Sequence, residues 1–114
     1  MTLTFTSSNG AAVAVVTGNI THAVSGEFQS SLLAALVESP ALVLDCSGIV
    51  MLTSAGLRVL LLLHREASAS GKLLALAAVP PAVRDVMEVT GFLDQFQSHP
   101  TVAEAIVATS QTKP

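Results

Sequence analysis

The chain has 114 residues, of which 51% are hydrophobic and only 11% are charged. This composition excludes an intrinsically disordered chain, because disorder requires low hydrophobicity and high net charge. The formal net charge is −3 and the five Lys and Arg residues are scattered along the chain. Binding to nucleic acid is therefore excluded as well, since it requires a basic patch that contacts phosphates.

The length and the first residues predict one compact domain that stays in the cytoplasm. A chain of this size suits one hydrophobic core, and we expect a single domain over residues 1–110 with a frayed tail at 111–114. Residues 1–10 lack the basic start and the apolar block of a secretion signal. We also expect no membrane insertion, because charged and polar residues interrupt every apolar run before the ~18 residues of a spanning helix.

Two strands and a helix are predicted for the first third of the chain. Residues 3–7 alternate apolar and polar side chains, residues 11–18 are rich in β-branched residues, and the Asn9-Gly10 pair between them is typical of a hairpin. A helix is expected from Thr21 to about Glu38. Its inward stripe recurs every fourth residue and consists of Val24, Phe28, Leu32 and Leu36.

The middle of the chain repeats a strand and helix pattern. The mostly apolar run 41–47 indicates a strand covered on both faces. A helix should follow from Ser54 to Ser70, with Gly71 in the left-handed conformation that ends many helices. Residues 72–79 then predict another buried strand.

The last third predicts two more helices and a short strand. A helix should begin at Pro81, carry Val83, Val86, Met87 and Thr90 inward, and end at Gly91 with Phe92 packing back. Residues 94–99 are expected to hold a short edge strand. The pair Thr101 and Glu104 has the spacing of a capping box and should open a final helix with Val102, Ala105 and Ile106 inward.

This order of elements predicts an α/β fold. An initial hairpin followed by alternating helices and strands favours a mixed sheet of about five strands with parallel crossovers. About four helices should lie mainly on one face of that sheet.

Four small residues interrupt the most apolar stretch of the chain: Thr53, Ser54, Ala55 and Gly56. We expect a strand-to-helix turn here, because functional groups gather where a strand hands over to a helix N-terminus. The Ser54 hydroxyl would either cap the helix or receive a phosphate that the helix dipole stabilises. Asp45, at the end of the preceding strand, would either orient this turn or bond to its own local backbone.

A helical projection of residues 54–70 separates two faces. Leu57, Leu60, Leu63 and Ala67 fall on the inner face. Leu61 and Leu62 should point outward near Arg58 and Arg65, on the side of Ser54. They form either a docking strip for a protein partner or an ordinary surface without a role.

An enzyme is the alternative of a different class. Cys46 or Ser54 would be the nucleophile and His22 its base. However, the sequence has no G-x-S-x-G elbow and no phosphate-binding G-x-x-x-x-G-K-[ST] loop. His64 lies several helical turns beyond Ser54, His99 stands next to a proline, and no His or Cys residues cluster at the spacing of metal ligands.

The ordered motifs resemble those of the STAS domain in anti-sigma factor antagonists. The carrying features are the apolar strand ending in Asp45, the turn "TSAGL" at 53–57, Gly71 before the next strand, "PPAVRDVMEVTG" at 80–91 and the capped last helix. Upstream, "VVTGNITHA" at 15–23 is similar to the entry of the family's first helix. The resemblance covers almost the whole chain.

The resemblance implies a five-stranded mixed sheet, no catalysis, no cofactor and no metal. It implies that the unphosphorylated protein binds an anti-sigma factor that is also a serine kinase, that the kinase phosphorylates Ser54, and that a metal-dependent serine phosphatase restores it. Family members often carry Asp where this sequence has Thr21 and Thr53. A constitutive regulatory or structural subunit without phosphorylation is therefore the alternative, and the oligomeric state stays open. The expected partner-binding residues are Thr21, Thr53, Ser54, Ala55, Gly56, Arg58, Leu61, Leu62 and Arg65.

Overall fold

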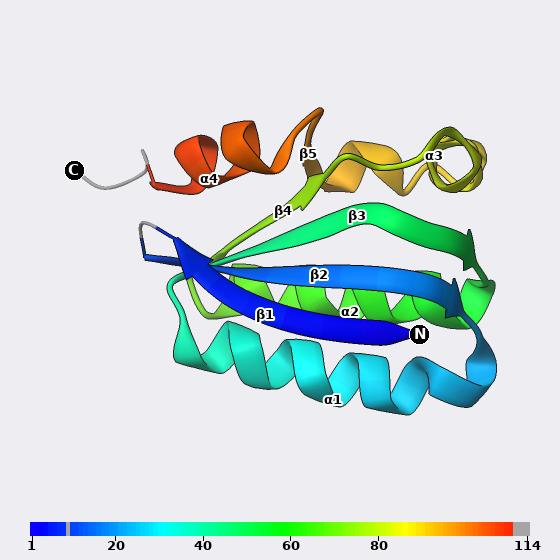
Figure 1. Cartoon of the computed structure of the whole chain (residues 1–114), viewed down its shortest axis with the longest axis horizontal. Coiled ribbons are helices and arrows are strands. Elements are labelled where there is room, and N and C mark those ends of the chain that lie inside the picture. The colour runs from blue at the N-terminus through cyan, green and yellow to red at the C-terminus, as the bar shows by residue number, and fades with distance from the viewer. Residues whose placement is uncertain (9, 111–114) are drawn as a thin grey trace.

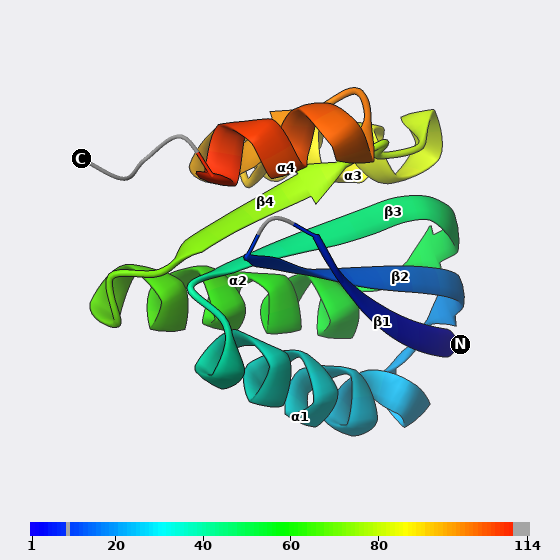
Figure 2. The same ribbon diagram turned by 60° about the vertical axis from the view of Figure 1, so that its left-hand side comes forward.

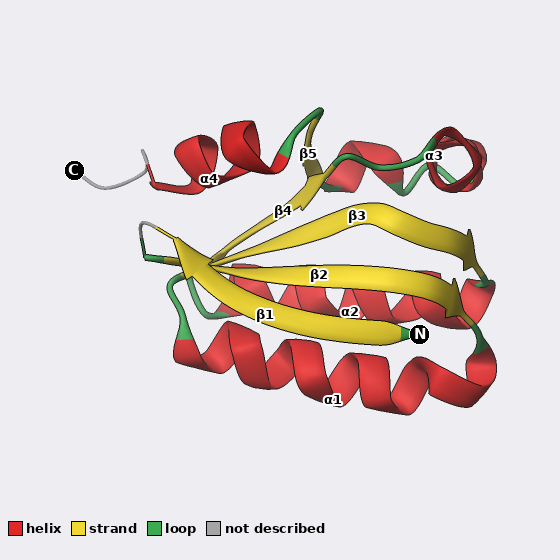
Figure 3. Ribbon diagram, in the orientation of Figure 1, coloured by secondary structure: helices red, strands yellow, loops and turns green. Residues whose placement is uncertain are grey.

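A five-stranded mixed sheet forms the centre of the protein, as seen in a computed structural model that describes residues 1–8 and 10–110 (Figures 1 and 3). The strands follow one another in chain order across the sheet: β1 (Thr2–Ser8), β2 (Ala11–Ile20), β3 (Ala41–Leu52), β4 (Leu73–Ala77) and β5 (Gln97–His99). The β1 and β2 strands are antiparallel and all other neighbours are parallel. The predicted fold class is confirmed.

Four α-helices connect or follow the strands. They are α1 (His22–Glu38), α2 (Ser54–Ala69), α3 (Pro81–Val89) and α4 (Val102–Ser110), and a 3-10 turn, η1 (Leu93–Gln95), precedes β5. The expected hairpin is present, because Ser8 pairs with Ala11 and Gly10 has a φ of +82°. Asn9 and the predicted tail at 111–114 lie outside the described residues.

Leucines of the strands β3 and β4 fill one face of the sheet, and mostly smaller side chains fill the other. The face that contacts α1 and α2 carries the leucines of β3 and β4, such as Leu44 and Leu76. The opposite face carries mostly alanines, such as Ala41 and Ala75, and Ala105 of α4 packs on it. Leu alternates with Val or Ala in the first part of β3 and in β4, and successive side chains of a strand point to opposite faces. The predicted placement of helices mainly on one face holds for α1 and α2 and for buried residues of α3, whereas α4 covers the other face (Figure 2).

Glycines end two helices as expected. Gly71 and Gly91 have φ values of +68° and +76°, which L side chains rarely adopt. After each glycine the next amide bonds back to the helix, Lys72 N–H to the Ala67 carbonyl at 2.8 Å and Phe92 N–H to the Met87 carbonyl at 2.9 Å. Both helix stops predicted from glycine are confirmed.

Two sequence predictions about these elements are wrong. β3 runs to Leu52 rather than ending at Ser47, because its register with β2 absorbs two irregularities instead of stopping at the polar residues. In α3 only Val83 and Met87 are buried, while Val86 and Thr90 are exposed. The buried stripe of this short helix consists of one pair of residues four positions apart, Val83 and Met87. It is too narrow to include Val86 and Thr90.

Candidate functional site

The ends of β2 and β3 meet at one edge of the sheet. Ile20 and Leu52 are the paired last residues of these parallel strands. One residue later in each case a helix begins, α1 after Thr21 and α2 after Thr53. Two helix N-termini are thus held side by side, which concentrates first-turn N–H groups and the positive ends of two helix dipoles.

Thr53 connects these two turns. Its backbone N–H donates to the Ile20 carbonyl at 3.1 Å, and its hydroxyl donates to the same carbonyl at 2.8 Å. The Thr53 side chain therefore makes no cap bond to its own helix, although Thr53 occupies the N-cap position. Of the two roles predicted for Ser54, the helix cap is wrong, because Thr53 occupies the N-cap position and Ser54 is the first residue inside the helix.

Gly56 lets α2 lie directly on the strand ends. It is buried, and a Cβ atom there would come within 2.6 Å of the Leu52 side chain and 2.7 Å of the Ile20 side chain. Even an alanine would have to displace these neighbours. Gly56 is therefore a packing residue, and its predicted role in partner binding stays a prediction.

Ser54 is exposed at the start of α2. Neither α1 nor α2 has an acidic residue in its first turn, so the positive potential of the helix ends is not compensated there. An anionic group on the Ser54 oxygen would lie next to first-turn N–H groups, which favour phosphate. Ser54 is thus exposed to solvent at a helix N-terminus that would stabilise a phosphate attached to its oxygen.

The other predicted partner-binding residues divide by exposure. Arg58 and Arg65 are exposed, whereas Thr21, Ala55 and Leu62 are half-buried. Leu61 does not point outward as predicted, because it packs against the main hydrophobic cluster. Helix α1 lies beside α2 and narrows the free surface of that helix (Figure 1). The leucine strip is consequently a weaker docking surface than the sequence indicated.

Two exposed apolar residues near Ser54 were missed by the sequence analysis. Val50 is 69% exposed and Met51 is 46% exposed, and both precede the turn on β3. The pairing changes from Gly18 with Ile49 to Asn19 with Met51, so Val50 is the extra residue of a β-bulge. The alternation of buried and exposed side chains breaks at this point, and sequence periodicity could not have revealed it.

Cys46 is unsuited to nucleophilic catalysis. It is buried, and burial is the main reason that its pKa rises to about 12. A thiolate is the reactive form of cysteine, so this thiol stays protonated and inert at neutral pH. The neighbouring Asp45 carboxylate accepts from the Ser47 N–H at 3.1 Å and from its hydroxyl at 2.8 Å, which is the local arrangement rather than one that orients the Ser54 turn.

The histidines are spread over different parts of the fold. His64 makes an edge contact with Phe96 at 5.4 Å between ring centroids, and His99 bonds to Gln97 at 3.1 Å. His22 is exposed at the first position of α1. Within residues 1–8 and 10–110, no three His, Cys, Asp or Glu side chains gather as a metal site would require. None of the helices described is long and apolar enough to cross a membrane.

Comparisons with known proteins agree with this arrangement. BtrV of Bordetella bronchiseptica, named for a proposed role as an anti-sigma factor antagonist, is 32% identical over 97 residues, or 84% of each chain. The crystal structure of an anti-sigma factor antagonist from Mycobacterium paratuberculosis is 27% identical, with a TM-score of 0.86 over 95% of this chain and 92% of that one. Unphosphorylated Bacillus SpoIIAA shares 17% identity and a TM-score of 0.81 over 99% and 100% of the two chains, and SpoIIAA has also been solved in a phosphorylated form.

The same fold also occurs in transporters. A sulfate transporter family protein from Wolinella succinogenes is 14% identical, with a TM-score of 0.76 over 88% of this chain and 84% of that one.

The STAS domain profile matches residues 3–105. The chain therefore belongs to the STAS domain family, and its relatives include anti-sigma factor antagonists.

Proposed function

We propose that the protein is a cytoplasmic anti-sigma factor antagonist that works by partner switching and thereby regulates transcription. Unphosphorylated, it binds an anti-sigma factor with serine kinase activity and so frees a sigma factor or another client. Phosphorylation of Ser54 releases it, and a metal-dependent serine phosphatase restores binding. The observation that carries this proposal is the exposed Ser54 hydroxyl on the first residue of α2, in a chain whose relatives include antagonists of this class.

The docking surface in this proposal is the switch face, which we define as Thr21, Val50, Met51, Ser54 and Arg58. Val50 and Met51 supply exposed apolar area close to the turn, as the centre of a protein interface requires. Arg58 lies one helical turn after Ser54 and is exposed. Its positive charge can orient an acidic partner without contributing much affinity by itself.

A phosphate on Ser54 would act on this face in two ways. It adds a charge of about −1.5 to −2 and three strong acceptor oxygens next to apolar side chains that a partner must cover. It also stands four residues before Arg58 on the same helical face, where an ion pair forms readily. The phosphate thus raises the cost of removing water from the switch face when a partner docks, and it also neutralises the charge of Arg58. The helix N-terminus stabilises the added negative charge, so the local fold stays unchanged.

Thr53 and Thr21 replace the acidic residues common in the family, and Thr53 has a structural task here. Its hydroxyl is already bonded to the Ile20 carbonyl, so it fixes the turn rather than the attacking oxygen of Ser54. A kinase would therefore have to supply the acidic groups that position the hydroxyl and the metal ion of ATP.

Phosphorylation by a candidate anti-sigma factor kinase tests the proposal. The wild type, Ser54→Ala and Ser25→Ala would be incubated with kinase and Mg-ATP and analysed by intact-mass and peptide mass spectrometry. Ser25 is the matched control, because it lies in the first turn of α1, where its hydroxyl donates to the His22 carbonyl at 2.8 Å. We expect one phosphate on the wild type and on Ser25→Ala and none on Ser54→Ala. A phosphate on Ser54→Ala would contradict the assignment.

The constitutive-subunit alternative rests on Thr21 and Thr53 and on the presence of this fold in a transporter family protein. It predicts a stable complex that Mg-ATP does not dissociate. Size-exclusion chromatography of the complex with and without Mg-ATP separates the two functions, because partner switching requires the antagonist to leave when Ser54 is phosphorylated.

A further inference from the structure

The first strand leaves one edge of the sheet open. β1 is the terminal strand, with seven residues in unbroken register against β2. It contains no proline and no charged residue, which are the usual protections of an exposed edge. The opposite edge strand, β5, has only three residues. The β1 edge is therefore the one suited to pairing with another extended segment.

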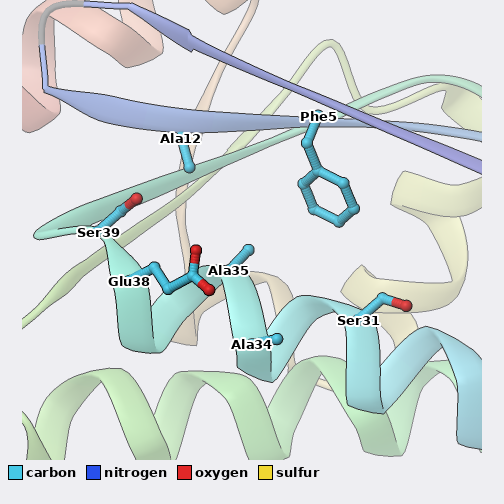
Figure 4. A pocket seen from close by; sticks show the side chains of 7 residues that line it. All are labelled: Phe5, Ala12, Ser31, Ala34, Ala35, Glu38 and Ser39. Atoms are coloured by element: carbon cyan, nitrogen blue, oxygen red, sulfur yellow. The ribbon is translucent and has the colours of Figure 1, made fainter.

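A groove of about 320 Å³ lies beside this edge, between β1 and α1 (Figure 4). Figure 4 shows the Phe5 ring projecting from β1 toward α1, and Phe5 is 44% exposed. The small side chains of Ser31, Ala34 and Ala35 on α1 do not fill the space between this helix and the Phe5 ring, which leaves the groove open. An added strand would place alternate side chains over this groove, because strand side chains point to opposite faces in turn. The lining residues are Phe5, Ala12, Ser31, Ala34, Ala35, Glu38 and Ser39.

The charge of the residues around the groove indicates which kind of segment would bind there. Glu38 is the charged residue among those that line the groove, and it is exposed. Residues 1–38 contain two glutamates and no Lys or Arg. At the same end of α1, the Lys72 ammonium donates to the carbonyls of Leu36 and Val37, at 2.6 and 2.7 Å. The β1 strand of a second copy has no Lys or Arg side chain to set beside Glu38, so a partner segment that carries one fits better.

We propose that the β1 edge and its groove bind an extended segment of a partner protein that carries the pattern Lys/Arg-x-apolar. The segment adds antiparallel to β1, the stronger of the two pairings. Phe5 pairs with Ala14 and Ser7 with Ala12, and Ala12 lines the groove together with Glu38. The apolar side chain therefore lies opposite Phe5, and the basic one, two residues earlier in the peptide, lies opposite Ser7 near Glu38.

This surface is separate from the switch face. The groove includes Ser39, just before β3 begins, whereas Ser54 follows the end of β3. A strand of twelve residues lies between these two positions. Binding at the β1 edge should consequently be independent of the state of Ser54, and the two sites can be tested separately.

Titration of the full chain with two labelled peptides tests the proposal. The first is Thr-Thr-Lys-Thr-Val-Thr-Val-Thr, and the second has Glu in place of Lys. NMR spectra of the ¹⁵N-labelled protein would locate binding, and fluorescence anisotropy would measure affinity. We expect the Lys peptide to shift the amides of residues 2–8 and of the second half of α1, and to bind more tightly than the Glu peptide.

Two charge reversals on the same helix provide the matched comparison. Glu38→Lys should weaken binding of the Lys peptide about three- to fivefold and strengthen binding of the Glu peptide, as expected for an exposed ion pair. Glu27→Lys, also exposed but outside the groove lining, should change either affinity less than about twofold. Ser54→Asp should leave both affinities unchanged.

Three results would overturn the proposal. They are no binding of the Lys peptide at about 1 mM, amide shifts confined to the switch face, and equal effects of the two charge reversals. Sedimentation of the wild type gives a fourth, since a dimer that Phe5→Ala dissociates would identify a second copy as the occupant. None of these results bears on phosphorylation of Ser54, so failure here and failure of the proposed function are distinguishable.

Discussion

The starts of α1 and α2 use the same construction with different degrees of restraint. Each helix follows a parallel strand after a single threonine at the N-cap. At the start of α1, the Val24 N–H donates to the Thr21 carbonyl at 3.2 Å, a bond that spans three residues as in a 3-10 turn. α2 begins with a full helical bond, from the Leu57 N–H to the Thr53 carbonyl at 3.0 Å.

The helices α1 and α2 also differ in how closely they pack at their glycines. Gly56 of α2 is wedged against side chains of Leu52 and Ile20, while a Cβ on Gly26 of α1 would meet nothing within 4 Å. Thr53 makes two bonds to the neighbouring turn, whereas Thr21 makes no side-chain cap bond. The protein therefore fixes the helix start that carries the exposed serine. A rigid mount lets an added phosphate change the surface without unfolding the turn.

The largest expected effect comes from adding one methyl group at each glycine. Gly56→Ala should destabilise the protein by about 1–3 kcal/mol, because the Cβ overpacks a filled site. Gly26→Ala should stabilise it by about 0.4–1 kcal/mol, since an exposed helical glycine becomes a better helix former in open space. Urea unfolding followed by circular dichroism measures both values. Equal effects of the same sign would show that the two helix starts are packed alike.

The bonds of Thr53 give a smaller effect. Thr53→Val removes the hydroxyl that donates to Ile20 and should cost about 1 kcal/mol. Thr53→Ser keeps the donor and should recover part of that loss, while Thr21→Val should cost less than Thr53→Val. Unfolding free energies of the three variants decide the matter. If Thr21→Val proved the more costly, Thr53 would not be the residue that joins the turns.

The smallest effect concerns charge at the first position of each helix. Ser54→Asp and His22→Asp should each stabilise the protein by about 0.3–1 kcal/mol, because an acidic side chain favours a helix N-terminus. Thermal unfolding at low salt measures the gain, and high salt should reduce it. The switch requires that the fold tolerate negative charge at position 54. Destabilisation by Ser54→Asp would contradict that requirement.

Sequence reasoning succeeded where local chemistry decides the structure. The Asn9-Gly10 hairpin signal, the stops at Gly71 and Gly91 and the inward stripe at Leu57, Leu60 and Leu63 depend on neighbours within a few residues. The bond from the Glu104 N–H to the Thr101 hydroxyl, at 3.1 Å, confirms the cap predicted for the last helix.

Reasoning failed where tertiary contacts override the pattern. Nothing in the local sequence shows that β3 continues past Gly48, where a Cβ would lie 2.6 Å from the Thr17 side chain of β2. The packing of the half-buried Leu61 likewise depends on a core assembled from several elements. The position of Ser54 one residue inside α2, rather than at the cap, follows from the bond of Thr53 to a distant strand end.

The central claim is that charge on Ser54 decides whether the partner docks, and one affinity measurement tests it directly. Calorimetry would compare the wild type before and after stoichiometric phosphorylation, each titrated with the kinase in the absence of ATP. The account predicts that phosphorylation weakens binding at least tenfold, about 1.4 kcal/mol or more, and that phosphatase treatment restores it. Equal affinity of the phosphorylated and unphosphorylated proteins would contradict the switch.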